Sequence, residues 1–317
     1  MKKQLKGAVP CFLAALIWGM SFVFQSTGVE KIGIFTFTTL RSFIGILVLI
    51  PMSVCSLRYA QKKNPQPPEV LRKSRKDLLV AGLLCGVCLF FGHNLQQSAF
   101  AYTEAGKVGF LTALYMILVP LIGLIFLRRN VSKAVWFSVV LACLGIFLIS
   151  FKPGAFGSFG RGELYALACS VFFAVQIIIS DEYANRVDCI AMCCLQFAVC
   201  GVLSAVCMFI CETPVWADIL SAKWELLYVG VLSTAGAFTL QLIGQKNADP
   251  VLASMLLCLE SVFSVLFAWM ILRQSLTAQE ITGCAIMFIA ILLTLIPKET
   301  WQNLFHKKSN ERMIHHG

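Results

Sequence analysis

The sequence predicts an all-α membrane protein with ten transmembrane helices arranged as two inverted five-helix repeats. The first observation is composition: of 317 residues, 58% are hydrophobic and 13% are charged, whereas a soluble domain is about half apolar and about a quarter charged. The second is that apolar windows of about 20 residues recur along almost the whole chain, without the alternation that strands of a membrane barrel show. The third is that the two halves resemble each other.

The apolar windows define ten expected spans that are joined by short connections. The exception is segment 54–77, which is strongly basic and carries Pro and Asn residues between 64 and 68, so we expect a solvated, partly mobile loop there. The first window is long, lacks a small-x-small cleavage site and contains Trp18 and Gln25, which indicates a retained span rather than a signal peptide. The expected spans are 7–25, 33–53, 78–98, 106–127, 134–151, 162–180, 189–211, 225–245, 250–272 and 278–296.

The distribution of charge predicts the orientation in the membrane. Most of the 26 Lys and Arg residues fall on one side if the N-terminus is inside, which is the positive-inside bias. They lie at helix ends and in a few loops rather than on one contiguous basic face, so the net charge of +10 does not indicate a nucleic-acid partner. We therefore expect a multi-pass protein of the plasma (inner) membrane with both termini, including the tail 301–317, in the cytoplasm.

The 14 cysteines do not predict a metal site or a disulfide framework. Most of them lie inside apolar runs, and no pair combines metal-ligand spacing with histidines. Cys85 and Cys88 form a C-x-x-C motif, but it falls in the middle of an expected span. We expect reduced thiols that act as small apolar packing residues, and no metal or cofactor.

The two halves match in three places that follow the same order along the chain. Five spans per half is an odd number, so the second half must enter the membrane from the opposite side, and the repeats are inverted. Inverted repeats are typical of secondary transporters, because two similar halves can exchange conformations. The expected domains are 1–152, 153–300 and the tail. The matches are ALIWGMSFVFQ (15–25) with ALACSVFFAVQ (166–176), LLVAGLL (78–84) with LLYVGVL (226–232), and LRRNVS (127–132) with LRQSLT (272–277).

Several stretches carry a resemblance to a known family. They are ALIWGMSFVF (15–24), TTLRSFIG (38–45), AGKVGFLTALYMILVPLIGLIFLRR (105–129), LACSVFFAVQIIISDEYA (167–184) and LESVFSVLFAWMILRQSLTAQEITG (259–283). With them the chain resembles, over nearly its whole length, the EamA-type branch of the drug/metabolite transporter superfamily.

This resemblance implies a central cavity between the two halves, alternating access, export of a metabolite and a membrane location. It does not name a substrate. The family's ninth span usually reads Glu-Pro and ends Gly-Glu, whereas here those positions are Glu260-Ser261 and Arg273-Gln274. Because the proline is missing, the sequence gives no support for a kink in that helix.

Glu260 is the acid that lies deep in an expected span, in MLLCLESVFSVLFAWM (255–270). A charged carboxylate at mid-bilayer costs about 2.5–3.5 kcal/mol on insertion scales, so this side chain should face protein or water. An acid that changes its protonation with access suits a proton-coupled carrier. A protonated Glu that only holds helices together is the alternative, and it stays open.

Arg41 is the basic residue that lies deep in an expected span, and arginine does not readily lose its proton. It could attract an anionic substrate group, or pair with an acid or a helix C-terminus. The family resemblance makes a structural role at least as strong a candidate. A direct Arg41–Glu260 pair is a further arrangement that the sequence allows.

Uncharged polar and aromatic residues from six spans complete the expected cavity. His93 with Gln97, and Gln241 with Gln245, are i, i+4 pairs that each share one helix face. For any one of these residues, an interhelical hydrogen bond explains its presence as well as substrate contact does. The candidates are Trp18, Ser21, Gln25, His93, Asn94, Gln96, Gln97, Tyr115, Gln176, Gln241, Gln245, Ser261 and Ser264.

The sequence therefore predicts a secondary active transporter of a small metabolite, either amino acid-like or another small polar or amphipathic solute. Its expected partners are that substrate, the lipid bilayer and protons, with the chain a monomer or a homodimer. The alternatives are a membrane-embedded enzyme and a channel-like facilitator. An enzyme would need converging catalytic groups, and the chain has no H-E-x-x-H or G-x-S-x-G motif.

Overall fold

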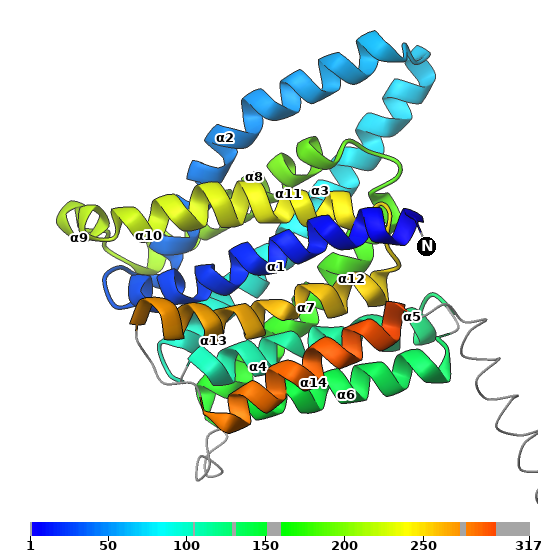
Figure 1. The fold of residues 1–317 in the computed structure, drawn as a ribbon. Helices are drawn as coiled ribbons and strands as arrows, with labels where there is room; N and C mark the ends of the chain where they lie inside the picture. Colours follow the sequence, from blue (N-terminus) through cyan, green and yellow to red (C-terminus); the bar gives the residue numbers. More distant parts are fainter. Residues whose placement is uncertain (1, 104, 129–130, 151–159, 273–276, 296–317) are drawn as a thin grey trace, which may run out of the picture.

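The computed structural model describes the chain except residues 1, 104, 129–130, 151–159, 273–276 and 296–317, so the expected tail lies outside the described residues. Within the described ranges every regular element is helical (Figure 1). The helices are α1 Lys2–Val29, α2 Ile34–Lys63, α3 Pro68–Phe100, α4 Ala105–Ala113, α5 Tyr115–Ile125, α6 Lys133–Ser150, α7 Arg161–Tyr183, α8 Cys189–Cys211, α9 Trp216–Ser221, α10 Lys223–Leu227, η1 Tyr228–Ala237, α11 Phe238–Gln245, α12 Pro250–Leu257, α13 Leu259–Leu272 and α14 Ala278–Leu295.

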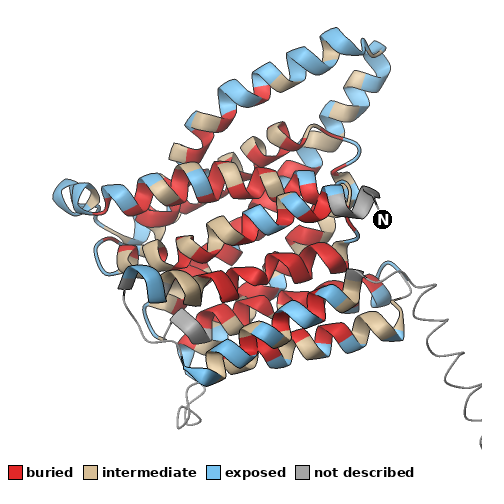
Figure 2. Cartoon of the chain, viewed as in Figure 1, coloured by how far each residue is buried: buried red, intermediate tan, exposed pale blue. Residues whose placement is uncertain are grey.

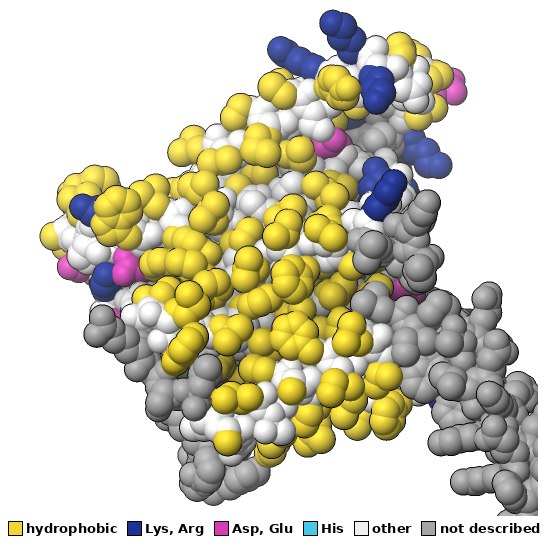
Figure 3. Space-filling view, viewed as in Figure 1, with side chains coloured by type: hydrophobic (Ala, Val, Ile, Leu, Met, Phe, Trp, Pro, Cys, Tyr) yellow, Lys and Arg dark blue, Asp and Glu magenta, His cyan; other side chains and the backbone are white. Residues whose placement is uncertain are grey.

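The main helices are long enough to cross a membrane, and the outer surface of the bundle is apolar. In the described part of the chain, eight helical segments are long and apolar enough to cross a bilayer, and two shorter apolar helices cover Lys133–Ile149 and Ala278–Thr294. Buried residues concentrate inside the bundle (Figure 2), while apolar side chains cover its outer face (Figure 3). The prediction of an all-helical, multi-span membrane protein is therefore confirmed.

Acidic caps and prolines define where several helices begin. Asp188 accepts a hydrogen bond from the Ala191 N–H at 2.9 Å at the start of α8. Asp249 accepts one from the Val251 N–H at 2.9 Å at the start of α12. Pro250 then occupies the first helical turn, where its missing N–H is not needed. Charged caps of this kind place the helix ends where water can reach them.

The expected mobile loop over 54–77 is helical, which corrects the sequence prediction. α2 continues to Lys63, and α3 begins at Pro68. Lys, Arg, Gln and Glu dominate this segment, and all of them are good helix formers, while Pro68 fits the first helical position. The polar composition indicated exposure to water correctly, but exposure does not prevent helix formation. The two helices project from the bundle as a hairpin (Figure 1).

Two spans are interrupted near their middles. The regular α-helical pattern of the expected fourth span is interrupted for one residue at Leu114, and that of the ninth at Cys258 although no proline is present. Both residues keep helical φ and ψ, and we call these two points the helix breaks. At each break the hydrogen bonding tightens to the i→i−3 pattern: Leu114 N–H bonds to Leu111 O at 3.3 Å, and Ser261 N–H bonds to Cys258 O at 3.1 Å. The missing proline after Glu260 had removed the sequence support for a kink in the ninth span, yet this span has an irregular turn at Cys258.

The two breaks touch each other. The Cys258 thiol donates to the Ala113 carbonyl at 3.5 Å, and the Tyr115 hydroxyl donates to Glu260 Oε1 at 3.5 Å. When the match of 127–132 with 272–277 is extended without a gap, it aligns Ala113 with Cys258 and Tyr115 with Glu260. Aligned residues therefore contact each other, as residues on a two-fold axis do.

Packing repeats between the halves as well. α1 packs against η1, α11, α12 and α13, while its sequence counterpart α7 packs against α3, α4 and α5. α2 packs against α8, and α6 packs against α14. The Gln97 amide donates to the Gln25 carbonyl at 3.1 Å, and the Gln245 amide donates to the Ile177 carbonyl at 3.2 Å. The two halves thus use the same helix contacts and similar hydrogen bonds.

One stretch differs between the halves. Tyr228–Ala237 is a π-helix, whereas its counterpart in the first half lies within the regular helix α3. The wider turn is packed closely against α2, because a Cβ added to Gly45 would lie 2.5 Å from Thr234 Cγ2. π-helical turns often lie at functional sites, and this one brings Ser233 and Thr234 toward Arg41.

We expect Gly283→Ala to destabilise the protein. A Cβ at Gly283 would lie 2.6 Å from the Gly145 carbonyl oxygen and 2.9 Å from Ile149 N, so backbone atoms of α6 and α14 must separate. Overpacking of this kind costs about 1–3 kcal/mol, and the midpoint of thermal unfolding in detergent should fall.

Gly123→Ala is the matched control for this measurement. No atom lies within 4 Å of a Cβ added at Gly123, and alanine favours the helix over glycine. Its unfolding midpoint should equal or exceed that of the parent protein. Equal midpoints for the Gly283 and Gly123 variants would contradict the close contact between α6 and α14.

Candidate functional site

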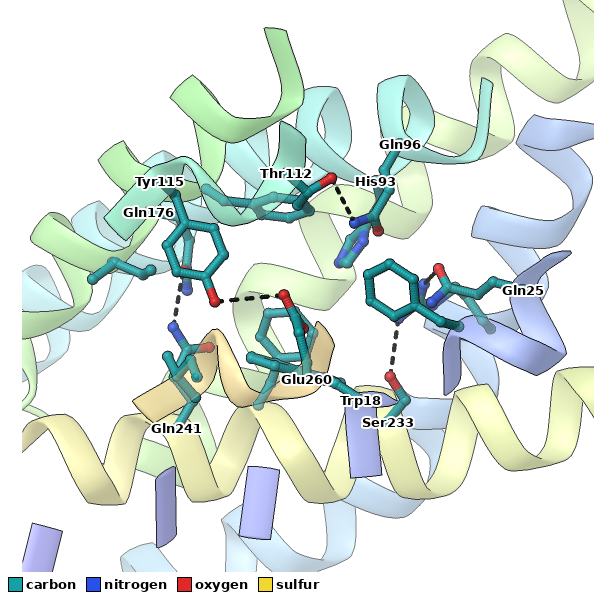
Figure 4. Close-up of a pocket in the computed structure, with 16 residues that line it drawn as sticks. Trp18, Gln25, His93, Gln96, Thr112, Tyr115, Gln176, Ser233, Gln241 and Glu260 are labelled. Atoms are coloured by element: carbon teal, nitrogen blue, oxygen red, sulfur yellow. Dashed lines mark hydrogen bonds between the residues drawn. The ribbon is translucent and has the colours of Figure 1, made fainter. Parts of the chain in front are cut away.

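A cavity with a volume of about 50 Å³ lies at the centre of the bundle (Figure 4). A water molecule needs roughly 10–15 Å³ of such space, so the cavity has room for a few waters. Both halves of the chain contribute to its walls. The lining residues are Trp18, Phe22, Gln25, Arg41, His93, Gln96, Thr112, Tyr115, Phe173, Gln176, Ile177, Ser233, Phe238, Gln241, Leu257 and Glu260.

Glu260 lies in the first turn of α13, directly after the break at Cys258. It is 5% exposed and points into the cavity, so it does not face lipid. Its hydrogen-bond partner in the described structure is the Tyr115 hydroxyl, at 3.5 Å. Tyr115 in turn begins α5, directly after the break at Leu114. The helix breaks therefore place the acid and its partner opposite each other (Figure 4).

Arg41 lies on another wall of the cavity and is 2% exposed. Its guanidinium donates to Gln25 Oε1 at 3.0 Å, to Thr234 Oγ1 at 3.2 Å and to Ser233 Oγ at 3.5 Å. A guanidinium has five N–H donors, so two of them have no protein partner among the described residues. Within that part of the chain Arg41 forms no ion pair, and the direct pair with Glu260 does not occur.

A chain of amide side chains forms a further polar region. The Gln241 amide donates to Gln176 Oε1 at 3.2 Å, and the Gln176 amide donates to Gln196 Oε1 at 3.3 Å and to Ser180 Oγ at 3.0 Å. The network is not complete, because Gln241 Oε1 and Gln196 Nε2 are buried without partners in the described structure. A buried polar atom without a partner is a place where water or a bound solute can contribute.

His93 lies among aromatic rings. Its ring centroid is 5.4 Å from that of Phe173, 5.9 Å from that of Phe197 and 5.5 Å from that of Phe238. Both of its ring nitrogens are buried without a hydrogen-bond partner in the described residues. The cavity is thus lined by aromatic rings, and it also contains buried polar atoms without hydrogen-bond partners in the described structure.

The cavity does not have the ligand set of a metal centre. Among the described residues, no group of three or more His, Cys, Asp or Glu side chains is positioned to hold a metal ion. Cys85 and Cys88 are free thiols, and the Cys85 thiol contacts the Ser180 hydroxyl at 3.7 Å.

Comparison with known proteins identifies the family. The model of the EamA-like transporter family matches residues 5–151 and 160–296, which is most of the chain in two copies. The chain belongs to the EamA-like transporter family. This EamA-like protein is therefore built from two EamA repeats, and it is a member of a family of membrane transporters.

Its relatives carry the same general description. It is 26% identical over 300 residues to an uncharacterized transporter of Archaeoglobus fulgidus, which covers 92% of this chain and 86% of that protein. It is 24% identical over 281 residues to the uncharacterized transporter YoaV of Bacillus subtilis, covering 88% of this chain and 92% of that one. A protein crystal structure with 22% identity superposes with a TM-score of 0.74 over 91% of this chain and 95% of that one, which shows a shared fold.

Nine of the fifteen residues singled out from the sequence line the cavity of the EamA-like protein, and six lie elsewhere. The lining residues among them are Trp18, Gln25, Arg41, His93, Gln96, Tyr115, Gln176, Gln241 and Glu260. Of the others, Ser21 accepts from Gln25, Asn94 donates to Phe90 O and Ser204, Gln97 and Gln245 donate to backbone carbonyls, and Ser264 donates to Ser261 O. These five make hydrogen bonds within or between helices, whereas the hydroxyl of the sixth, Ser261, is buried without a partner in the described structure.

Some cavity residues gave little or no sequence signal. Ser233 lies on the π-helix, and Thr112 accepts from the Gln96 amide at 3.4 Å just before the first helix break. A lone Ser or Thr in an apolar run is too common to single out. Phe22, Phe173 and Phe238 form the aromatic wall, and their side chains could not be told apart from ordinary core phenylalanines.

We expect Arg41→Lys to lower the stability of the EamA-like protein. A lysine ammonium lacks the planar fork of arginine, so it cannot reach Gln25, Ser233 and Thr234 together. An unsatisfied buried polar group costs about 1–3 kcal/mol, and the midpoint of thermal unfolding in detergent should fall. Arg72→Lys, at an exposed position, is the control and should leave the midpoint unchanged. Equal midpoints for the two variants would show that the Arg41 hydrogen bonds do not matter for stability.

Proposed function

We propose that this protein is a secondary active transporter that carries a small amphipathic solute by alternating access. The observation that carries the proposal is the central cavity, which is walled by both halves and in which an acid lies beside the two touching helix breaks. Local breaks in helices around a mid-membrane site are typical of secondary transporters, in which such helices line the substrate site at the interface between the repeats.

The proposed architecture has ten spans in two inverted repeats. The shorter apolar helices Lys133–Ile149 and Ala278–Thr294 would be the fifth and tenth spans. Five spans per half invert the second repeat relative to the first. The paired breaks in the fourth and ninth spans, and the contacts of aligned residues there, support this arrangement. We propose a plasma (inner) membrane location with both termini in the cytoplasm, and the positive-inside bias supports this orientation.

The proposed substrate class is an amino acid-like zwitterion with an apolar side chain. The two remaining N–H groups of Arg41 suit a carboxylate, which arginine can bind with two parallel hydrogen bonds. Glu260, with one long hydrogen bond, is available for an ammonium group. Trp18, Phe22 and Phe238 supply the apolar surface that an amphipathic solute needs.

Proton coupling and export complete the proposal. Glu260 would alternate between a protonated form and a form that binds the substrate ammonium group. Proton binding and substrate binding would then exclude each other at one residue. Proton uptake from outside would accompany substrate release to the outside, so an inward proton gradient would drive export. Two observations motivate this coupling role: Glu260 is buried deep in an expected span, and its hydrogen-bond partner in the described structure is Tyr115.

We expect zwitterionic leucine to stabilise the purified protein more than either of two matched analogues. Leucinol lacks the carboxylate, and 4-methylpentanoate lacks the ammonium group, while both keep the isobutyl side chain. A ligand that binds the folded state raises the unfolding midpoint by mass action. Alanine and phenylalanine, tested alongside, bracket the preferred side-chain size. Equal shifts from the amino acids and from their one-charge analogues would contradict recognition of both charges.

We expect Glu260→Gln to uncouple proton movement from substrate movement. Glutamine cannot gain or lose a proton, but its amide oxygen can still accept a hydrogen bond from the substrate ammonium group, so exchange of labelled substrate across proteoliposomes should persist with a weaker apparent affinity. The acidification that a pH-sensitive dye reports after substrate addition should be no larger for this variant than for liposomes without protein. Glu69→Gln, an exposed acid on the α2–α3 hairpin, is the control and should retain both signals. Normal dye signals from the Glu260 variant would refute the coupling role.

A further inference from the structure

The hairpin formed by the ends of α2 and α3, residues 54–77, is longer than the membrane requires. α2 has 30 residues and α3 has 33. At a rise of about 1.5 Å per residue, helices of this length exceed the roughly 30 Å hydrocarbon core of a bilayer. The excess lies at the end where the two helices meet, so this end of each helix must lie in the headgroup region or beyond it.

The hairpin leans away from the bundle. Figure 1 shows its tip well to the side of the ends of α1 and α6, rather than straight beyond them. Two contacts hold its base to the turn between α7 and α8: the Ser56 hydroxyl donates to Asp188 Oδ2 at 2.6 Å, and the Ser74 hydroxyl donates to Arg186 O at 3.2 Å. This placement carries the hairpin to the side of the bundle (Figure 1), where lipid would surround a membrane-embedded protein.

The hairpin is also strongly basic. Most of its charged side chains are cationic and exposed, and they gather near the tip in Figure 3. Glu69 and Asp77 are its two acidic residues. The basic residues are Arg58, Lys62, Lys63, Arg72, Lys73, Arg75 and Lys76.

Exposed apolar side chains alternate with these charges. Tyr59 is 66% exposed, Val70 is 48% exposed and Leu57 is 45% exposed. The Lys63 ammonium lies 5.9 Å from the centroid of the Tyr59 ring. A membrane interface takes up tyrosine rings and aliphatic side chains while cations reach the phosphates.

We propose that the α2–α3 hairpin is a binding surface for anionic phospholipid headgroups of the adjacent leaflet. Its lysines and arginines contact lipid phosphates, and Leu57, Tyr59 and Val70 insert at the level of the headgroups. Basic segments next to a transmembrane helix are attracted to anionic leaflets by the surface potential. This inference does not depend on the transported substrate, and it would stand if the coupling role of Glu260 failed.

The test uses the full chain, delipidated in a neutral detergent and titrated with phosphatidylglycerol or with phosphatidylcholine. We expect phosphatidylglycerol to raise the unfolding midpoint, since it binds the folded hairpin. The triple variant Lys62→Gln, Lys63→Gln, Lys73→Gln should need on the order of tenfold more phosphatidylglycerol for the same shift. Added salt should weaken the response of the parent protein, because salt screens exposed charges.

Two further variants keep the test decisive. Lys6→Gln, Lys133→Gln, Lys246→Gln removes the same charge from three exposed lysines away from the hairpin, and it should respond like the parent protein. Replacing Lys62, Lys63 and Lys73 with arginine keeps the charge and should preserve the full response. Equal shifts from the two lipids, or equal losses in the two glutamine variants, would overturn the proposal. So would a hairpin-dependent shift from a single-stranded oligonucleotide in the absence of a response to phosphatidylglycerol.

Discussion

The contact between two broken helices at the centre of the bundle is the constraint on which the rest of the structure depends. At each break one turn tightens to the i→i−3 pattern while the backbone stays helical, and both breaks lie inside the protein beside the cavity. Here the breaks at Leu114 and Cys258 face each other, so that the Cys258 thiol bonds to the Ala113 carbonyl and Tyr115 bonds to Glu260. The other helices enclose this contact, and the cavity is the space that remains around it.

The helix packing that is repeated in the two halves encloses the cavity, and residues that differ between the halves determine which polar groups line it. Gln25 and Gln176 are aligned in sequence, and each is bonded by a residue of the following span. Gln25 accepts from the charged Arg41 at 3.0 Å, whereas Gln176 donates to the neutral Gln196 at 3.3 Å. One half therefore presents a fixed positive charge and the other presents amides. A cavity with this difference can orient a solute that has unlike ends.

Sequence reasoning reached the spans and the deep acid because both depend on composition summed over long windows. It could not separate Gln96, which lines the cavity, from Gln97, which bonds to the Gln25 carbonyl, because adjacent helical residues differ by about 100° and one sequence does not fix the rotation. The breaks at Leu114 and Cys258 have no proline or glycine beside them. They arise from tertiary contacts between residues that are far apart in sequence, which local propensity does not report.

In the proposed arrangement of inverted repeats, Glu260 would lie at the pseudo-two-fold axis, which bears on how an acid can serve both sides of a membrane. When two inverted halves exchange conformations, residues far from the axis move from one environment into another. A residue on the axis keeps similar neighbours in both arrangements, here its aligned partner Tyr115. Access to such a residue can then alternate while its immediate surroundings stay constant. An acid elsewhere in the same helix would need a new set of partners in each state, at the cost of leaving buried polar groups unpaired.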